Sequence, residues 1–162
     1  MAYKREDILV AWVEALGDVK VANGFFTDAG ANAVIRYPFL PEADIIATDY
    51  KARTDSSQGM FFLLDSTIPE TRDFEKAESG HEHWTLTIQI VAITAKTTTL
   101  SVDLNKLIGD VKKLVTQNRK AGGNCVIDSR VDSVVISPTV SKPYAGAVIT
   151  LEVIYQTTDL NP

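Results

Sequence analysis

Residues Trp84 to Thr94 read Trp-Thr-Leu-Thr-Ile-Gln-Ile-Val-Ala-Ile-Thr, and this stretch decides the fold. In its first half apolar side chains alternate with polar ones, which is typical of a β-strand with one face on a core. Its second half is apolar at nearly every position, so both faces of that end are expected to be covered. The stretch therefore predicts a long strand with one half-solvated end and one doubly covered end.

Two amphipathic helices are expected, one near the start of the chain and one after this strand. From Leu104 to Val115 the apolar residues recur at the three- and four-residue intervals of one helix face. Gly122-Gly123 follows and is expected to end that helix. Lys4 to Leu16 carries its apolar residues on one stripe and is followed by Gly17. Both patterns predict helices.

The other regular segments are predicted to be extended. They are, with approximate bounds, Ala33 to Tyr37, Asp44 to Tyr50, Cys125 to Ile136 and Tyr144 to Thr157, with a short extended piece at Asn23 to Gly30. Strands that follow one another favour antiparallel pairing, and two helices can cover one face of such a sheet. The sequence therefore predicts an α+β fold, a mostly antiparallel β-sheet with two main helices packed on one face.

The composition indicates one soluble domain. The 162 residues are 45% hydrophobic and 23% charged, values typical of a folded chain with a sizeable core. The formal net charge of -5 disfavours grip on a phosphate backbone or on an anionic membrane. Cys125 is the only cysteine, so no disulfide can form within the chain. We expect a single domain over residues 1–162 with no membrane-spanning segment.

A long, polar, acidic connection at about residues 51–83 stands out from this pattern. It contains a bare apolar run, Met60 to Leu64, which is either a buried strand or a surface that docks on a neighbouring copy. As a strand, the run is expected to pair with Ile45 to Tyr50. The acidic part, Ser66 to His83, is the better candidate for contact with another molecule. The predicted interface residues are Phe61, Phe62, Arg72, Asp73, Phe74, Glu75 and Lys76.

No catalytic arrangement is expected. His81 and His83 would point to one side of a strand and could hold a metal together. They are the only histidines, however, and no acidic residue is singled out as a third ligand. Cys125 lies in an apolar strand, which favours a core position over a nucleophile. The sequence therefore predicts a protein that is not an enzyme, with no cofactor and no metal, whose surface carries its function.

Several local signatures follow one another along nearly the whole chain. They are an opening helix at Arg5 to Leu16, the piece Gly24-Phe25-Phe26-Thr27-Asp28, the proline of Leu40-Pro41-Glu42, the tryptophan-led strand Trp84-Thr85-Leu86-Thr87-Ile88, the helix ended by Gly122-Gly123, and a final strand at Ile149 to Thr157. In this layout the chain resembles the tail terminator (tail completion) proteins of long-tailed bacteriophages. The connection at Lys51 to His83 is longer than is usual in that family.

The resemblance implies a structural virion protein of viral tail assembly. Such a protein forms a ring, expected to be a homohexamer, that caps the head-proximal end of the tail tube, ends tube polymerisation and provides the surface for head–tail joining. Its expected partners are its own copies, the tail tube protein and a head–tail connector or neck protein. DNA is expected to pass through the lumen without specific binding. The expected location is the neck end of the virion tail, after synthesis in the host bacterial cytoplasm.

Two alternatives stay open. A head–tail connector or neck protein would belong to the same assembly but would bind partners on the portal side. A small metal-binding or enzymatic module would use His81 and His83. The tail terminator is the leading hypothesis.

Overall fold

The computed structural model describes residues 4–32, 34–38, 59–65, 68–73, 81–95, 100–137 and 144–158. Both predicted helices are present in it. They are α1 (Lys4–Gly17) and α3 (Leu100–Gln117). Gly122 and Gly123 follow α3 in a turn with φ of +106° and +91°, in the left-handed region that favours glycine. None of the described helices is long and apolar enough to cross a bilayer.

The segment after α1 differs from its prediction as an extended piece. It contains two short 3₁₀ helices, η1 (Val21–Asn23) and η2 (Ala29–Ala31). Gly24 lies between them with φ of +84°, and its N–H donates to the Val21 carbonyl. Turn hydrogen bonds, together with bonds from the N–H groups of Phe26 and Thr27 to Asp110 of α3, therefore satisfy backbone groups here without a strand partner.

The sheet contains six strands, β1 (Ile35–Tyr37), β2 (Met60–Asp65), β3 (Thr71–Asp73), β4 (His81–Ala95), β5 (Val126–Ser137) and β6 (Tyr144–Thr158). Their order across the sheet is β1-β2-β4-β6-β5, and β3 also pairs with β4. The β1–β2 pair is parallel, and all the other pairs are antiparallel. The predicted α+β class with a mostly antiparallel sheet is confirmed.

The pair β4–β6 forms the spine of the sheet. It runs without interruption from His81 opposite Thr158 to Ala95 opposite Tyr144. On the other edge of β4, β2 pairs with its second half and β3 with its first half. The two neighbours of β2 are thus β1 and β4. The predicted partner of β2, residues 45–50, lies outside the described residues.

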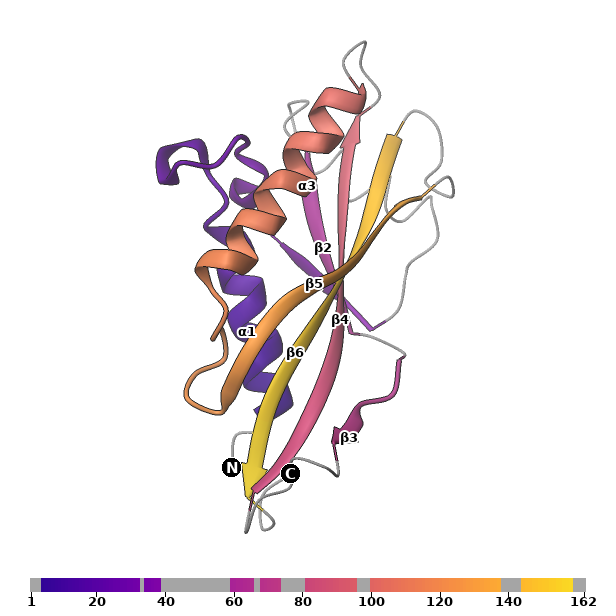
Figure 1. The fold of residues 1–162 in the computed structure, drawn as a ribbon. Helices are drawn as coiled ribbons and strands as arrows, with labels where there is room; N and C mark the ends of the chain where they lie inside the picture. Colours follow the sequence, from indigo (N-terminus) through magenta and orange to yellow (C-terminus); the bar gives the residue numbers. More distant parts are fainter. Residues whose placement is uncertain are drawn as a thin grey trace.

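Both helices pack on one face of the sheet, which gives a two-layer molecule (Figure 1). The main core lies between the layers. Its members include Trp12 of α1, Val111 of α3, Phe61 of β2, Ile88 of β4 and Ile149 of β6, all fully buried. The prediction of two helices on one face is therefore confirmed.

A second, smaller cluster lies on the opposite face of the sheet. It contains Met60, Phe62, Leu64, Val91 and Ile93, all buried. The second half of β4 is thus covered on both faces, as the alternation of Trp84 to Thr94 predicted. The ring of Phe62 packs against that of Tyr37, with 5.5 Å between the centroids.

The structure corrects the predicted interface role of Phe61 and Phe62. Because adjacent side chains of a strand point to opposite faces, Phe61 enters the main core and Phe62 the second cluster. Both side chains are buried within the chain itself, so neither is open to a partner.

Candidate functional site

The sheet ends at two different edges, which form the first part of the candidate site. On one side the last strand is β5, twelve residues long, and no described strand pairs with its outer edge. On the other side the outer strands are β1 and β3, of three residues each. Free edge strands offer unpaired N–H and C=O groups that can add a further strand. Among the strands that the structure describes, the sheet therefore has an edge without a neighbour on each side.

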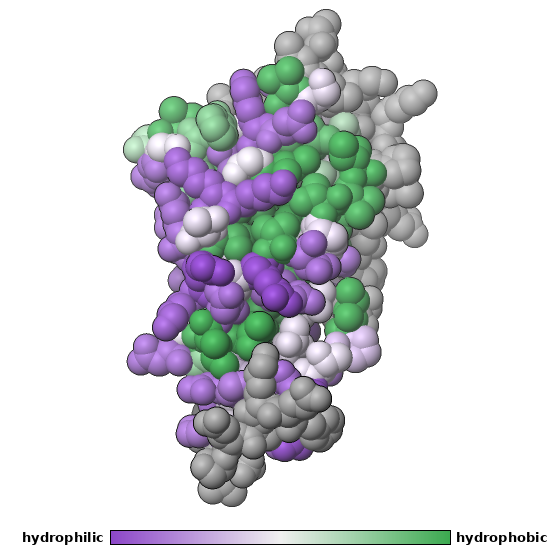
Figure 2. Space-filling model, viewed as in Figure 1, coloured by the Kyte–Doolittle hydropathy of each residue, from purple (hydrophilic) through white to green (hydrophobic). Residues whose placement is uncertain are grey.

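The strand β5 combines this free edge with exposed apolar residues. Val135 is 57% exposed and Ile136 is 64% exposed. Figure 2 shows hydrophobic surface gathered over this part of β5. Register shifts at Val126/Asp128 and at Val131/Ser133 mark two irregularities in its pairing with β6. Natural edge strands are often protected by charge, and this end of β5 is instead apolar.

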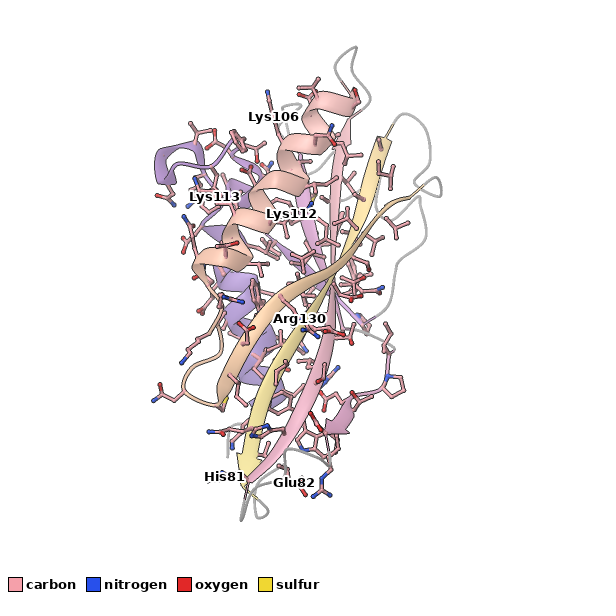
Figure 3. All side chains as sticks on the ribbon, viewed as in Figure 1. His81, Glu82, Lys106, Lys112, Lys113 and Arg130 are labelled. Carbon is pink, nitrogen blue, oxygen red and sulfur yellow. The ribbon has the colours of Figure 1, made fainter. Side chains whose placement is uncertain are left out.

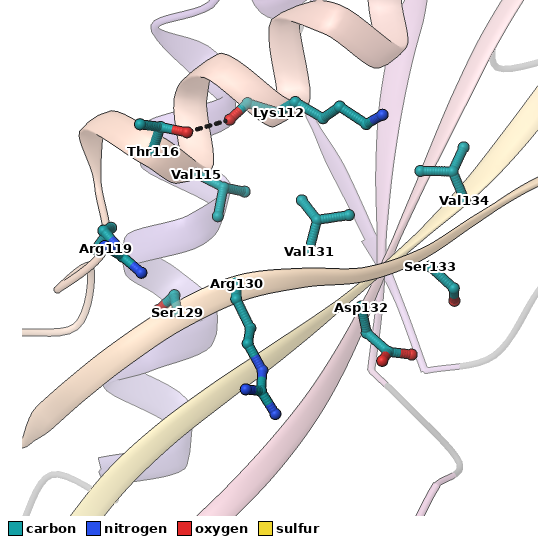
Figure 4. A pocket seen from close by; sticks show the side chains of 10 residues that line it. All are labelled: Lys112, Val115, Thr116, Arg119, Ser129, Arg130, Val131, Asp132, Ser133 and Val134. Atoms are coloured by element: carbon teal, nitrogen blue, oxygen red, sulfur yellow. Dashed lines mark hydrogen bonds between the residues drawn. The ribbon is translucent and has the colours of Figure 1, made fainter.

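A cavity of about 640 Å³ lies beside β5, between this strand and the second half of α3 (Figure 4). We call it the α3–β5 groove. It is lined by apolar Val115, Val131 and Val134 and by polar Lys112, Arg119 and Ser129, among others. Its lining therefore joins an apolar floor to a cationic rim of Lys112, Arg119 and Arg130, and Asp132 adds one carboxylate to the same lining.

The cationic rim is formed mainly by α3. Lys112 has no ion pair with any described residue, and Figure 3 shows it on the side of α3 toward β5. Arg119 pairs with Asp128, with 2.9 Å between Nε and Oδ1. Arg130 also borders the groove, but its side chain points away from α3 to Glu152 of β6, 2.6 Å from Nη2 to Oε2. The hydrogen bond to Glu152 raises the pKa of Arg130.

Ser129 lies beneath this rim on β5. Its side chain is 1% exposed, and its hydroxyl has no hydrogen-bond partner among the described residues. A buried polar group without a partner costs about 1–3 kcal/mol of stability, so such groups are rare in native structures and mark places where an unseen acceptor or donor fits. The wall of the groove therefore holds a buried hydroxyl that no described residue satisfies.

The opposite edge of the sheet carries a network of carboxylates and arginines. Arg36 of β1 forms paired contacts with Glu6 of α1, at 2.6 and 2.9 Å, and with Asp65 of β2, at 2.6 and 2.7 Å. The hydrogen bonds to Asp65 and Glu6 raise the pKa of Arg36, and the Arg36 hydrogen bond lowers that of Glu6. This network ties α1 to the outer strands.

A second carboxylate, Glu70, lies between α1 and β6. It is 2.9 Å from Nε of Arg5 and accepts a hydrogen bond of 3.0 Å from the Tyr155 hydroxyl. Burial first, and then the charge of Glu70, raise the pKa of Tyr155 well above its ordinary range. The edge is therefore rich in acidic groups that are held in place.

The predicted interface residues are placed in different regions. Arg72 and Asp73 lie on β3, where Arg72 pairs with Glu82 and Asp73 is opposite His83. Phe74, Glu75 and Lys76 fall outside the described residues. Two of the predicted interface residues, Arg72 and Asp73, therefore lie on the outer strand β3.

His81 and His83 lie two positions apart at the start of β4, and residues at this spacing in a strand point to one face. His81 is labelled in Figure 3. No group of three metal-ligating side chains forms among the residues that the structure describes. The Nδ1 atom of His83 is buried without a hydrogen-bond partner there. Two imidazoles alone are fewer than the three protein ligands of a catalytic zinc site.

The groove was missed at the sequence level because its parts are distant in the chain. Lys112 and Arg119 are recognisable as a basic spot at a helix end. Ser129, by contrast, gives only a weak sequence signal, because the packing of β5 against α3 is what buries its hydroxyl. A polar residue at an inward position of an alternating strand is the one clue that was present.

Comparisons with known proteins add no assignment to this geometry. A scan against protein-family models gives no match. A search of curated proteins gives no significant match.

Proposed function

We propose that this chain is a structural virion protein, a tail terminator that forms a ring on the head-proximal end of a phage tail tube. The observation that carries the proposal is a pair of edges, on opposite sides of one sheet, that no other described strand covers, β5 on one side and β1 with β3 on the other. The layout that resembles the tail terminator family supports the same assignment.

Opposite edges of one molecule favour a head-to-tail contact between copies. A contact of this kind, repeated through a rotation, closes into a ring when the rotation returns to its start. The exposed Val135 and Ile136 supply apolar area next to the free backbone of β5. Backbone pairing and apolar burial together are the means by which an added strand gains affinity.

The proposed mechanism is occupancy of an interface, with no reaction. A ring, expected to contain six copies, covers the last tube subunits, stops further polymerisation and presents its other side to a head–tail connector. The net charge of -5 is compatible with a lumen through which DNA passes without being held. The protein would then reside at the neck end of the virion tail.

The proposal is tested by native mass spectrometry and electron microscopy with the tail tube protein of the same phage. We expect one defined ring and tubes that stop growing when the ring is present. A strict monomer that never binds tube ends would refute the proposal. A ring that binds only portal-side proteins would replace it with a connector.

Substitution at the free edge tests the observation that carries the proposal. We expect Val135→Lys with Ile136→Lys to abolish the ring and leave a folded monomer, because two lysines oppose strand addition at an edge. Val102→Lys is the matched control, since Val102 is 51% exposed and belongs to the first turn of α3 instead of to an edge strand. The control variant should form rings like the unmodified chain.

A further inference from the structure

We propose that Asn23, in the turn that follows α1, is a site of spontaneous deamidation whose rate is set by the opening of that turn. The inference is independent of the proposed ring, because it concerns the chemistry of one loop. Asn23 is the only one of the chain's six asparagines that a glycine follows. Since glycine has no Cβ, the backbone nitrogen of Gly24 is the least hindered neighbour that an asparagine side chain can have.

The reaction needs only the chain and water. The Gly24 nitrogen gives up its proton to a base in solution and attacks Cγ of Asn23, so that a new N–Cγ bond forms. The Cγ–Nδ2 bond breaks, ammonia leaves, and a five-membered succinimide ring remains. Water then opens the ring at one of its two carbonyls, which gives either aspartate or isoaspartate. In sum, an amide and water become a carboxylate and ammonium, with no change of oxidation state.

Solvent reaches both reacting residues in the folded chain. Asn23 and Gly24 are exposed, and so are Val21 and Ala22 before them. Burial therefore excludes neither the base nor the water. Protection of Asn23 has to come from the backbone conformation and from the hydrogen bonds of the turn.

The turn holds the two reacting groups apart. Asn23 ends η1, where 3₁₀ geometry sets ψ at about −20 to −30°, and closure of the succinimide needs this ψ to rotate away from that range. The Gly24 N–H donates to the Val21 carbonyl at 2.9 Å. The side-chain amide of Asn23 donates to the Asp18 carbonyl at 2.8 Å. The ring can therefore close only after the turn opens.

Contacts from α3 oppose this opening. Lys113 donates from Nζ to the Gly24 carbonyl at 2.5 Å, and Figure 3 shows Lys113 on the side of α3 toward the turn. The same ammonium lies 5.3 Å from the centre of the Phe25 ring, a cation–π distance. Asp110 of the same helix holds the next part of the loop through two backbone N–H groups. Because a reaction of an opened state follows the population of that state, α3 sets the rate at Asn23.

The reaction changes an exposed part of the molecule. Isoaspartate adds a methylene to the main chain between Cα of Asn23 and the Gly24 nitrogen, which displaces the N–H that bonds to Val21. Either product adds a negative charge to a chain of net charge -5. Val21 is 53% exposed and Phe26 is 64% exposed, so apolar surface flanks the site. Deamidation therefore alters the presentation of this apolar loop as the protein ages.

Incubation of the full chain at mildly alkaline pH tests the site. Peptide mapping by mass spectrometry measures the conversion of amide to acid at each asparagine, and electron-transfer fragmentation separates aspartate from isoaspartate. We expect conversion at Asn23 in the folded chain, and conversion at least about tenfold faster in urea, where the turn is open. Asn124 is the internal control, because it is exposed in a turn but is followed by Cys125. It should convert much more slowly than Asn23 in urea.

Substitution of Lys113 tests the control by α3. We expect Lys113→Met to speed conversion at Asn23 in the folded chain by at least about threefold and to leave the rate in urea unchanged. Lys106→Met is the matched control, since Lys106 is exposed and stands two turns earlier on the same helix face. Its rate should equal that of the unmodified chain. Circular dichroism and thermal unfolding check that each variant is folded, and the comparison of folded and unfolded chain needs no variant.

Each outcome bears on one step of the inference. No conversion at Asn23 in urea, or conversion in urea with none in the folded chain, overturns the site in the native protein. Equal rates in the folded and unfolded chain overturn the control by the turn. A Lys113→Met rate equal to that of the unmodified chain overturns the control by α3. None of these measurements involves a ring, so failure of the ring proposal leaves them unchanged.

Discussion

Asp110 is a fully buried carboxylate on α3 that organises the loop between α1 and β1. It accepts hydrogen bonds from the backbone N–H of Phe26 at 2.7 Å, the N–H of Thr27 at 3.0 Å and the Thr27 hydroxyl at 2.7 Å. Lys113, three positions along the helix, donates to the Gly24 carbonyl at 2.5 Å. A single turn of α3 therefore holds this glycine–aromatic loop in one conformation.

We expect Asp110→Ala to lower the free energy of unfolding by about 2–4 kcal/mol, because three donors lose a charged acceptor and two of them are buried. Asp110→Asn should cost less, since its carbonyl can keep part of the bonding. Urea denaturation monitored by circular dichroism measures both. Glu14→Ala, at an exposed position of α1, should change stability by less than about 0.5 kcal/mol. Equal stability of Asp110→Ala and the unmodified chain would contradict this assignment.

Tyr155 makes stability sensitive to alkaline pH. Its pKa is raised in the folded chain above the ordinary value of 10.0, by burial first and then by the charge of Glu70. The unfolded chain therefore loses the phenol proton at lower pH than the folded chain does. This stabilising contribution is complete below pH 10.0 and falls as the pH rises beyond it.

We expect the stability difference between the unmodified chain and Tyr155→Phe to shrink as the pH rises above 10. Lysine deprotonation affects both proteins equally, so its effect on stability cancels in this difference. Urea titrations at a series of pH values measure it, and ultraviolet absorbance of the tyrosinate follows the phenol directly. A difference that stays constant or grows with pH would show that the phenol ionises normally.

At the scale of elements, β2 joins the two clusters of the molecule. Its residues alternate between the main core, with Phe61 and Leu63, and the second cluster, with Met60, Phe62 and Leu64. This explains why the run is apolar at every one of these positions, where a strand with one solvated face would alternate. The run is a core element of the chain.

We expect Phe61→Ala and Phe62→Ala each to lower the free energy of unfolding by about 3–5 kcal/mol, the usual cost of emptying a buried phenylalanine site. Phe26→Ala is the matched control, because Phe26 is 64% exposed and its loop is held through the backbone. The control should lose less than about 1 kcal/mol. The midpoints of denaturant unfolding measure the stability of the three variants. A ring defect in Phe61→Ala without loss of monomer stability would restore the interface interpretation.

At the scale of the whole molecule, the central strands of the sheet differ from the outer ones in how many of their backbone edges are paired. Strands β4 and β6 have neighbours on both edges, whereas β5 has a described neighbour on one edge only. Backbone groups that are paired and buried open least often. Assembly at β5 would change this pattern, because an added strand pairs its outer edge.

We expect amides of β4 and β6 to exchange hydrogen most slowly in the isolated chain and half of the β5 amides to exchange faster. On ring formation the β5 amides should slow by about tenfold or more, with little change in β4. Hydrogen exchange read by mass spectrometry, below and above the assembly concentration, measures this. A β5 that is unchanged on assembly would place the contact on another surface.

Much of the fold could be predicted from local pattern. The helical period at Leu104 to Val115 and the alternation at Trp84 to Ile88 each depend on neighbours a few positions away, and α3 and β4 confirm them. The neighbours of β2 could not be predicted in the same way. An apolar run has no preferred partner of its own, and its pairing with β1 and β4 is settled by which strands share the core.

The sequence by itself determined the α+β class, the two helices and the long strands, because these depend on periodicity and residue order. Only the tertiary structure decided that Phe61 and Phe62 are buried on opposite faces, that β5 has one neighbour among the described strands, and that Lys112, Arg119 and Ser129 line one groove. The physical reason is that exposure and electrostatic neighbourhood are properties of packing. Residues distant in the chain acquire them only when the helix layer closes on the sheet.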